Sequence, residues 1–282
     1  MAHVPRNVVH DWLRHDKKFP HVWCPGCGLG IILGSLVRAL ARSGLSKDQV
    51  VLVSGIGCSG RLPVYVDVGS VHTTHGRALT FATGIKLANP ELTVITVMGD
   101  GDATAIGGNH LIHAARRNLD IVSIIANNQT YGMTGGQFSP TTPLGAKATT
   151  AWYGHVEPSF DISALCATAG ASFVARTTVI HVDRMDGLIL QAMKRPGFSV
   201  VEVLTPCYTN YGRQNRLGSH LEMMKSYRSA AVPADRWAKM DETERQGRFA
   251  VGVLVDREMP RYLDSYRDVC ETAKKLREEG KL

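Results

Sequence analysis

Apolar runs of five to seven residues recur along this chain, and helix-like segments stand between them. Short apolar runs bounded by turn residues are typical of strands buried on both faces, and apolar residues spaced three and four apart are typical of helices. Strands that alternate with helices predict an α/β fold, in which helices cover both faces of a mostly parallel sheet. The expected strands are 50–55, 92–98, 120–126, 171–176 and 198–204, and the expected helices are 28–43, 76–88, 103–117, 160–169 and 182–194.

The composition changes near residue 213, where the chain becomes charged and amphipathic. We therefore expect a main domain over 1–212 and a helical C-terminal extension over 213–282. A chain of 282 residues is long enough for one large domain with such an extension. No stretch is apolar enough to cross a membrane, and the N-terminus lacks the apolar core of a secretory signal. We therefore expect a cytoplasmic protein without membrane contact.

The formal net charge of +7 raises the possibility of a nucleic-acid partner. The basic residues are mixed with acidic ones and form no basic face, and aromatic residues are not interleaved with them. We expect no nucleic-acid binding. A mild positive excess suits anionic small molecules or an acidic protein partner.

Polar residues directly follow two of the expected strands. These are Gly99, Asp100 and Gly101 after one strand, and Asn127 and Asn128 after the next. Parallel strands end at one edge of their sheet, where ligands bind. Asp100 and Asn128 offer hard oxygen atoms that suit Mg²⁺ with phosphates, and the glycines let the backbone approach a phosphate. The helix that follows would point its free N–H groups at the same anion. A glycine turn with an asparagine cap is the alternative that needs no ligand.

Cysteines lie in three further turns near the same edge. They are Cys24 and Cys27 in WCPGCG, Cys58 in GIGCSGR and Cys207 in LTPCYTNYG. Four thiolates can hold either a tetrahedral zinc ion or an iron–sulfur cluster, and the residues alone leave both open. Cys166 and Cys270 stand in helical segments and fit packing or surface positions.

These motifs, in their order along the chain, resemble the β subunits of the 2-oxoacid:ferredoxin oxidoreductases, a family of thiamine diphosphate enzymes. The resemblance covers roughly 20–215, with WCPGCG, GIGCSGRLP, HTTHGRA, GDGDATAIGGNH, NNQTYGMTGGQFSPTT and TPCYT. It implies that Asp100, Asn128 and the backbone carbonyl of Thr130 bind magnesium. It further implies one four-iron, four-sulfur cluster on Cys24, Cys27, Cys58 and Cys207.

The resemblance also implies which residues contact thiamine diphosphate. His75 in HTTHGRA, and His72 with it, would lie close to the cofactor, and His75 and Arg61 are the predicted catalytic residues. The full set of expected cofactor contacts is Gly57, Cys58, Ser59, His75, Gly99, Asp100, Gly101, Asp102, Asn128, Thr130, Gly132, Met133 and Thr134.

The reaction implied by the resemblance is the oxidative decarboxylation of a 2-oxoacid, with coenzyme A accepting the acyl group and ferredoxin the electrons, or its reversal to fix CO₂. The glutamate that activates thiamine lies outside this chain, so we expect an α subunit to supply it in an αβ unit paired as α2β2. A non-oxidative thiamine enzyme with a structural zinc site, and a zinc-stabilised nucleotide-binding protein, are the rival classes.

Arg61 bears on the choice of substrate. It follows Cys58 by three residues, and a guanidinium can clamp a carboxylate through paired hydrogen bonds. Relatives with a basic residue at this turn act on 2-oxoglutarate or on a broad range of 2-oxoacids, so we expect 2-oxoglutarate, with a broad-specificity or pyruvate enzyme as the alternative. Gly135 and Gly136 stand where some relatives carry a lysine, so a second basic contact is absent.

Overall fold

The computed structural model describes residues 8–16 and 19–281. In this part of the chain the strands form one eight-stranded sheet in the order β2-β1-β3-β4-β6-β5-β8-β7. Every pair from β2 to β5 is parallel, which confirms the predicted α/β architecture. The strands are β1 Val50–Ser54, β2 Gly69–His72, β3 Thr93–Gly99, β4 Ile121–Asn127, β5 Phe173–Thr178, β6 Ser199–Leu204, β7 Ala231–Pro233 and β8 Phe249–Asp256.

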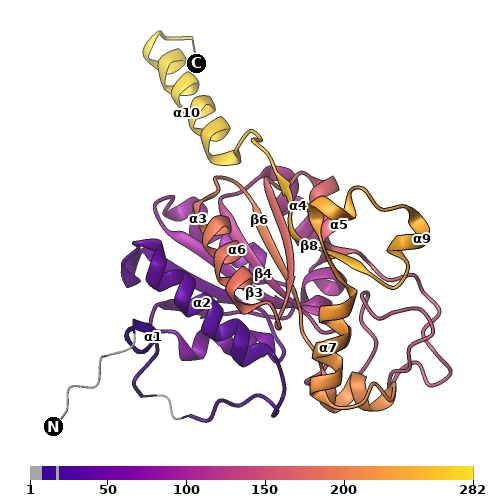
Figure 1. Ribbon diagram of the computed structural model, residues 1–282. Helices are drawn as coiled ribbons and strands as arrows, with labels where there is room; N and C mark the ends of the chain where they lie inside the picture. Colours follow the sequence, from indigo (N-terminus) through magenta and orange to yellow (C-terminus); the bar gives the residue numbers. More distant parts are fainter. Residues whose placement is uncertain (1–7, 17–18, 282) are drawn as a thin grey trace.

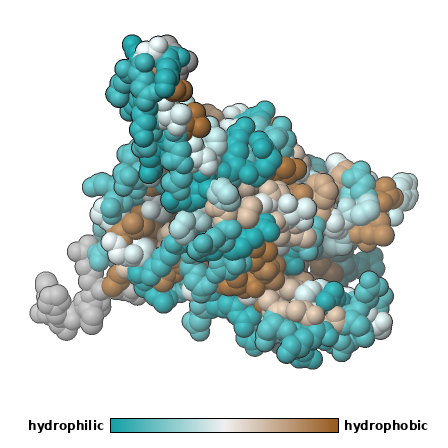
Figure 2. All heavy atoms as spheres, turned by 90° about the horizontal axis from the view of Figure 1, so that it is seen from above, coloured by the Kyte–Doolittle hydropathy of each residue, from teal (hydrophilic) through white to brown (hydrophobic). Residues whose placement is uncertain are grey.

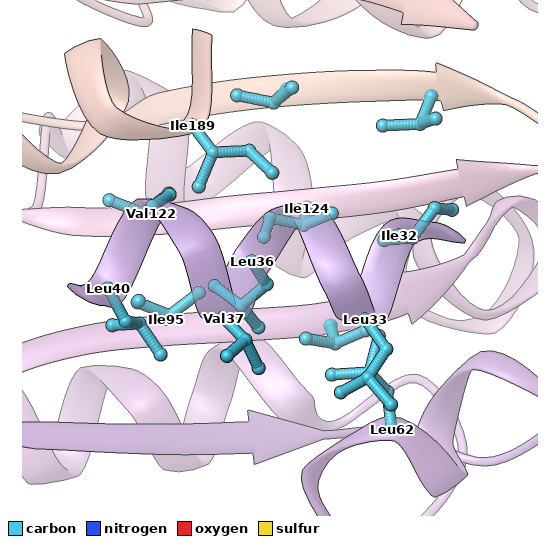
Figure 3. Packing of buried hydrophobic residues seen from close by; sticks show 14 of the residues in the cluster. Ile32, Leu33, Leu36, Val37, Leu40, Leu62, Ile95, Val122, Ile124 and Ile189 are labelled. Carbon is cyan, nitrogen blue, oxygen red and sulfur yellow. The ribbon is translucent and has the colours of Figure 1, made fainter. Parts of the chain in front are cut away.

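Helices cover both faces of the sheet (Figure 1). One face packs against α2 and α6, and the other against α3, α4 and α5. Figure 3 shows the first face, where Ile32 and Leu36 of α2 lie over Ile124 of the sheet. The longer helices are α2 Leu29–Ser43, α3 Ala78–Ala88, α4 Gly108–Arg117, α5 Ile162–Ala169, α6 Val182–Lys194, α7 His220–Ala230 and α10 Tyr262–Glu278.

Several short helical turns complete the description. They are α1 Val8–Asp11, η1 Lys47–Gln49, η2 Ser59–Tyr65, η3 Asp102–Ile106, η4 Tyr208–Gly212, α8 Ala234–Trp237 and α9 Glu242–Arg245. The π-helical turn η3 separates the end of β3 from α4, so the single helix expected over 103–117 is two segments. Single π turns of this kind are frequent at functional sites.

The C-terminal part of the chain contains the expected helix but is not purely helical. Strand β8 pairs with β5 in antiparallel orientation and β7 pairs with β8, so both belong to the main sheet. The prediction missed them because the run FAVGVLVD stands among charged residues that dominate the composition. Helix α10 follows and projects away from the sheet (Figure 1), and none of its residues is buried.

Hydrophilic residues cover much of the face shown in Figure 2, and hydrophobic residues form smaller patches between them. Within the described ranges, no helix has both the length and the apolar character needed to cross a bilayer.

The parallel order places several strand ends at one edge of the sheet. Gly99 at the end of β3 lies beside Ala126 of β4, and Asn127 of β4 lies beside Leu204 of β6. The residues that follow these strands therefore emerge together, as the sequence predicted for Asp100 and Asn128.

Candidate active site

A cavity of about 100 Å³ opens at this edge, and we call it the inner cavity. Every residue of the predicted set of cofactor contacts lines it, whereas His72 does not. The lining includes Gly57, Cys58, Ser59, His75, Gly99, Asp100, Gly101, Asp102, Asn128, Thr130, Gly132, Met133 and Thr134. The structure thus brings together residues from four separate turns, and their roles toward a cofactor stay a prediction.

Asp100 is the most deeply buried charged group of the inner cavity, with 1% of its surface exposed. Its Oδ2 accepts hydrogen bonds from Ser139 Oγ at 2.5 Å and from Thr141 Oγ1 at 2.6 Å. Its Oδ1 accepts only a long bond, 3.4 Å, from the backbone N–H of Asn128. Burial raises the pKa of the Asp100 carboxyl. A cation at Oδ1 would compensate this buried charge, so the donor set fits magnesium.

Two glycines keep the walls of the inner cavity close together. A Cβ on Gly101 would come within 2.4 Å of Cε1 of Tyr131, whose hydroxyl donates to the Gly101 carbonyl at 3.2 Å. A Cβ on Gly132 would lie 3.3 Å from Cys207 Sγ and 3.8 Å from Asn128 Nδ2. Side chains at these two positions would fill space between the donor groups.

His75 is held in place by Asp102. The Asp102 carboxylate Oδ1 accepts hydrogen bonds from His75 Nδ1 and, at 2.7 Å, from the backbone N–H of Gly76. The Tyr131 ring meets His75 edge-on, with 5.9 Å between the ring centroids. Because a carboxylate only accepts, Nδ1 of His75 carries the proton and Nε2 remains available. His72 instead bonds Ser54 Oγ at 2.9 Å and does not line the inner cavity.

A second cavity of about 410 Å³, the outer cavity, lies beside the first. Its lining includes all four cysteines of the predicted set and Arg61: Cys24, Cys27, Cys58, Cys207 and Arg61. Burial raises the pKa of the Cys27 thiol to about 12, and burial also raises the pKa of Cys58 and of Cys207. A bound cation would be needed to keep these thiols deprotonated at neutral pH.

The four cysteines of the predicted set line the same cavity. Among the residues described, no group of three Cys, His, Asp or Glu side chains is arranged to hold one metal ion. A single zinc ion needs each sulfur at about 2.3 Å. Four thiols that line one cavity suit either a zinc ion or an iron–sulfur cluster. Trp23 supports this arrangement, because its Nε1 donates to the Cys58 carbonyl at 2.7 Å and links two cysteine turns.

The two cavities share a wall. Leu29, Cys58, Asn128, Gly132 and Met133 line both of them. A group in the outer cavity would therefore lie directly beside a group in the inner cavity.

The remaining cysteines lie elsewhere. Cys166 lies within α5 and is 1% exposed in the core, and burial raises its pKa. Cys270 is partly exposed on α10. Neither lines the inner or outer cavity, in agreement with the sequence prediction.

Sequence reasoning missed the residues behind Asp100. Ser139 and Thr141 bond its carboxylate from a loop that begins after β4. Also missed was Glu202, a buried residue of β6 that accepts a hydrogen bond from Asn127. A glutamate within the apolar run FSVVEVL was a visible signal of a buried polar contact.

Comparison with known proteins agrees with this geometry. Residues 55–203 match the family of the thiamine pyrophosphate enzyme C-terminal TPP binding domain. The chain is 47% identical to the 2-oxoglutarate synthase subunit KorB of Methanothermobacter marburgensis, over 93% of this chain and 91% of that protein. It is 46% identical to the 2-oxoacid:ferredoxin oxidoreductase subunit beta of Saccharolobus solfataricus, over 66% of this chain and 62% of that one.

A solved structure is similar over almost the whole chain. It is the 2-oxoglutarate:ferredoxin oxidoreductase from Magnetococcus marinus with 2-oxoglutarate, coenzyme A and succinyl-CoA bound, and it superposes with a TM-score of 0.84 at 30% identity, over 97% of this chain and 93% of that chain. The chain therefore belongs to the family of 2-oxoacid:ferredoxin oxidoreductase β subunits, within the group of 2-oxoglutarate synthase subunits named KorB.

Proposed function

We propose that this chain is the β subunit of a 2-oxoglutarate:ferredoxin oxidoreductase that uses magnesium thiamine diphosphate and one four-iron, four-sulfur cluster. The reaction converts 2-oxoglutarate and coenzyme A to succinyl-CoA and CO₂, and two electrons pass to ferredoxin; the reverse reaction fixes CO₂. The observation that carries the proposal is the shared wall between a cavity with buried oxygen donors and a cavity with four thiols.

The inner cavity would hold the magnesium diphosphate. Asp100 Oδ1, the Asn128 side chain and the Thr130 carbonyl are the proposed metal ligands. When bound, thiamine diphosphate supplies a carbon nucleophile for the keto carbon of the 2-oxoacid, and the cluster accepts electrons one at a time. Cys24, Cys27, Cys58 and Cys207 would hold that cluster.

Within the described part of the chain, His75 has one ring nitrogen free of a protein partner for its proposed role. Asp102 binds Nδ1, so Nε2 is left to exchange a proton with substrate. Tyr131 packs against the ring and restricts its rotation.

Arg61 supports the proposed substrate. It lines the outer cavity close to Cys58, and its charge lowers the pKa of that thiol in opposition to burial. 2-Oxoglutarate carries a second carboxylate that pyruvate lacks, and a guanidinium binds such a group through paired hydrogen bonds. Gly135 and Gly136, which have φ angles of 113° and 92°, add no second cation.

An α subunit completes the proposed enzyme. It would supply the glutamate that activates thiamine, in an αβ unit assembled as α2β2. Ferredoxin is the proposed electron acceptor. A reducing compartment such as the cytoplasm would keep the four thiols free of disulfides.

The test is anaerobic co-purification with the α subunit, followed by assay of a panel of 2-oxoacids with coenzyme A and ferredoxin. We expect brown protein that bleaches on reduction and turns over 2-oxoglutarate fastest. Preference for pyruvate would overturn the substrate assignment. Colourless protein that contains zinc would overturn the cluster.

A further inference from the structure

The two adjacent asparagines at the end of β4 contact different parts of the protein. Asn128 lines the inner cavity, whereas Asn127 is 5% exposed and bonds the interior residue Glu202. We infer that Asn127, Glu202 and Arg176 are positioning residues for the magnesium diphosphate site. This inference rests on the proposed function, because it takes Asp100 and the turn after β4 as that site.

Glu202 lies within β6 and is 2% exposed. Its Oε1 accepts a hydrogen bond from Asn127 Nδ2 at 2.8 Å. Its Oε2 accepts bonds from Ser163 Oγ at 2.6 Å and from Arg176 Nε at 2.8 Å. Arg176 lies opposite Glu202 in the β5–β6 register and also contacts Asp161 at the N-terminus of α5. Both carboxylate oxygens are therefore satisfied inside the protein.

This carboxylate determines which way the Asn127 amide faces. A carboxylate only accepts hydrogen bonds, so Asn127 must turn Nδ2 toward Glu202 and Oδ1 toward the site. Oδ1 then accepts the backbone N–H of Gln129 at 3.2 Å. Gln129 has a φ of 62°, a left-handed conformation that is uncommon outside glycine. The amide thus helps to hold the turn that carries Asn128.

Thr141 lies between Asn127 and Asp100. Its Oγ1 lies 3.1 Å from Asn127 Oδ1 and 2.6 Å from Asp100 Oδ2. The next residue, Thr142, donates its hydroxyl to the Gln129 carbonyl at 2.7 Å. The loop after β4 therefore binds both Asp100 and the left-handed turn, and Asn127 lies between them.

A buried ion pair is weak evidence for stability, because desolvation offsets much of the attraction. Arg38 and Asp186 offer a comparison in the same chain. Their closest approach is 2.6 Å, the Asp186 side chain is 9% exposed, and the pair joins α2 and α6 on the opposite face of the sheet. Neither residue lines the inner or outer cavity. This pair therefore serves as a control, because it is a partly buried ion pair that does not contact the proposed magnesium site.

The experiment compares Glu202→Gln with Asp186→Asn in the αβ complex. Each complex is stripped with EDTA, and the apparent Kd for Mg²⁺ at saturating thiamine diphosphate is measured by calorimetry, together with the thermal midpoint. Glutamine brings an N–H₂ group to the Asn127 amide, so we expect Glu202→Gln to weaken Mg²⁺ binding about 10–100-fold. Asp186→Asn lowers the midpoint but keeps the wild-type Kd.

Asn127→Leu gives an independent reading if Glu202→Gln fails to fold, since it removes the amide that joins Glu202 to the Gln129 turn at nearly constant volume. A weaker Kd in either variant supports the inference. Wild-type Kd values in the folded variants, with or without a lower thermal midpoint, would overturn it. A wild-type complex that binds no Mg²⁺–thiamine diphosphate would instead overturn the proposed function.

Discussion

Asp100 illustrates how local sequence and distant contacts combine at a single residue. The sequence places it directly after a buried strand, and this position alone predicted that it lies at the edge of the sheet. Its two oxygen atoms nevertheless differ, because Ser139 and Thr141 both bind Oδ2. Those bonds join residues about forty positions apart, so no local pattern could have predicted them.

Asp100→Ala should abolish binding of magnesium thiamine diphosphate. The loss should exceed the roughly 10–100-fold that removal of a supporting hydrogen bond costs, because a direct carboxylate ligand is removed. Thiamine content of the purified αβ complex measures the effect, and iron content should stay at the wild-type value. Unchanged thiamine content would contradict the ligand assignment.

Cys207→Ser should lose the cluster, whereas Cys166→Ser and Cys270→Ser should retain it. Only Cys207 of these three lines the outer cavity. Iron and sulfide analysis of anaerobically purified variants decides the matter. If Cys166→Ser loses iron to the same degree, the four-cysteine set is wrong.

Arg61→Ala should cost about 2–5 kcal/mol of transition-state stabilisation on 2-oxoglutarate, because it leaves a desolvated carboxylate without its partner. The measurement is kcat/KM for 2-oxoglutarate and for pyruvate with the same enzyme preparation. Pyruvate turnover should fall much less. Equal losses on both substrates would show that Arg61 contacts the carboxylate common to both, or only supports the Cys58 turn.

At the scale of elements, apolar periodicity predicted the central strands and the helices around them within a few residues. Helix α2, for example, ends at Gly44 in a left-handed conformation, as a glycine C-cap predicts. Apolar periodicity did not predict the strands whose formation depends on pairing with a distant part of the chain. Strand β8 pairs with β5 in antiparallel orientation, and composition in a charged region does not reveal such a partner.

Two valines test whether β8 packs in the core while α10 does not. Val251 in β8 is 1% exposed, and Val269 in α10 is 62% exposed. Val251→Ala should lower the free energy of unfolding by about 2 kcal/mol, since two buried carbons are lost. Val269→Ala should change it by less than about 0.5 kcal/mol. Urea unfolding of both variants provides the comparison, and equal effects would contradict the distinction.

At the scale of the whole molecule, the sheet brings four separate turns of the chain to one edge. The resemblance in the motifs predicted which residues would meet there, and the topology confirmed their proximity. Cys58 belongs to both predicted sets and so implied that the two sites adjoin, but the other residues of the shared wall depend on how η2 and the turn after β4 pack in three dimensions.

Removal of residues 266–282 should leave the body of the subunit folded. Helix α10 has no buried residue, and most of its length projects from the sheet (Figure 1). The shortened chain should keep the wild-type thermal midpoint and iron content. A large drop in the midpoint would show that the end of α10 supports the body in solution.

The strand order also has a consequence for synthesis of the protein. Three of the four cysteines lie within the first 58 residues, but Cys207 follows β6, which inserts between β4 and β5. Before β6 and Cys207 have been synthesised, the nascent chain contains three of the four cysteines. It cannot yet form the complete outer cavity. Maturation factors that load a cluster held by all four thiols must therefore act after most of the chain has left the ribosome.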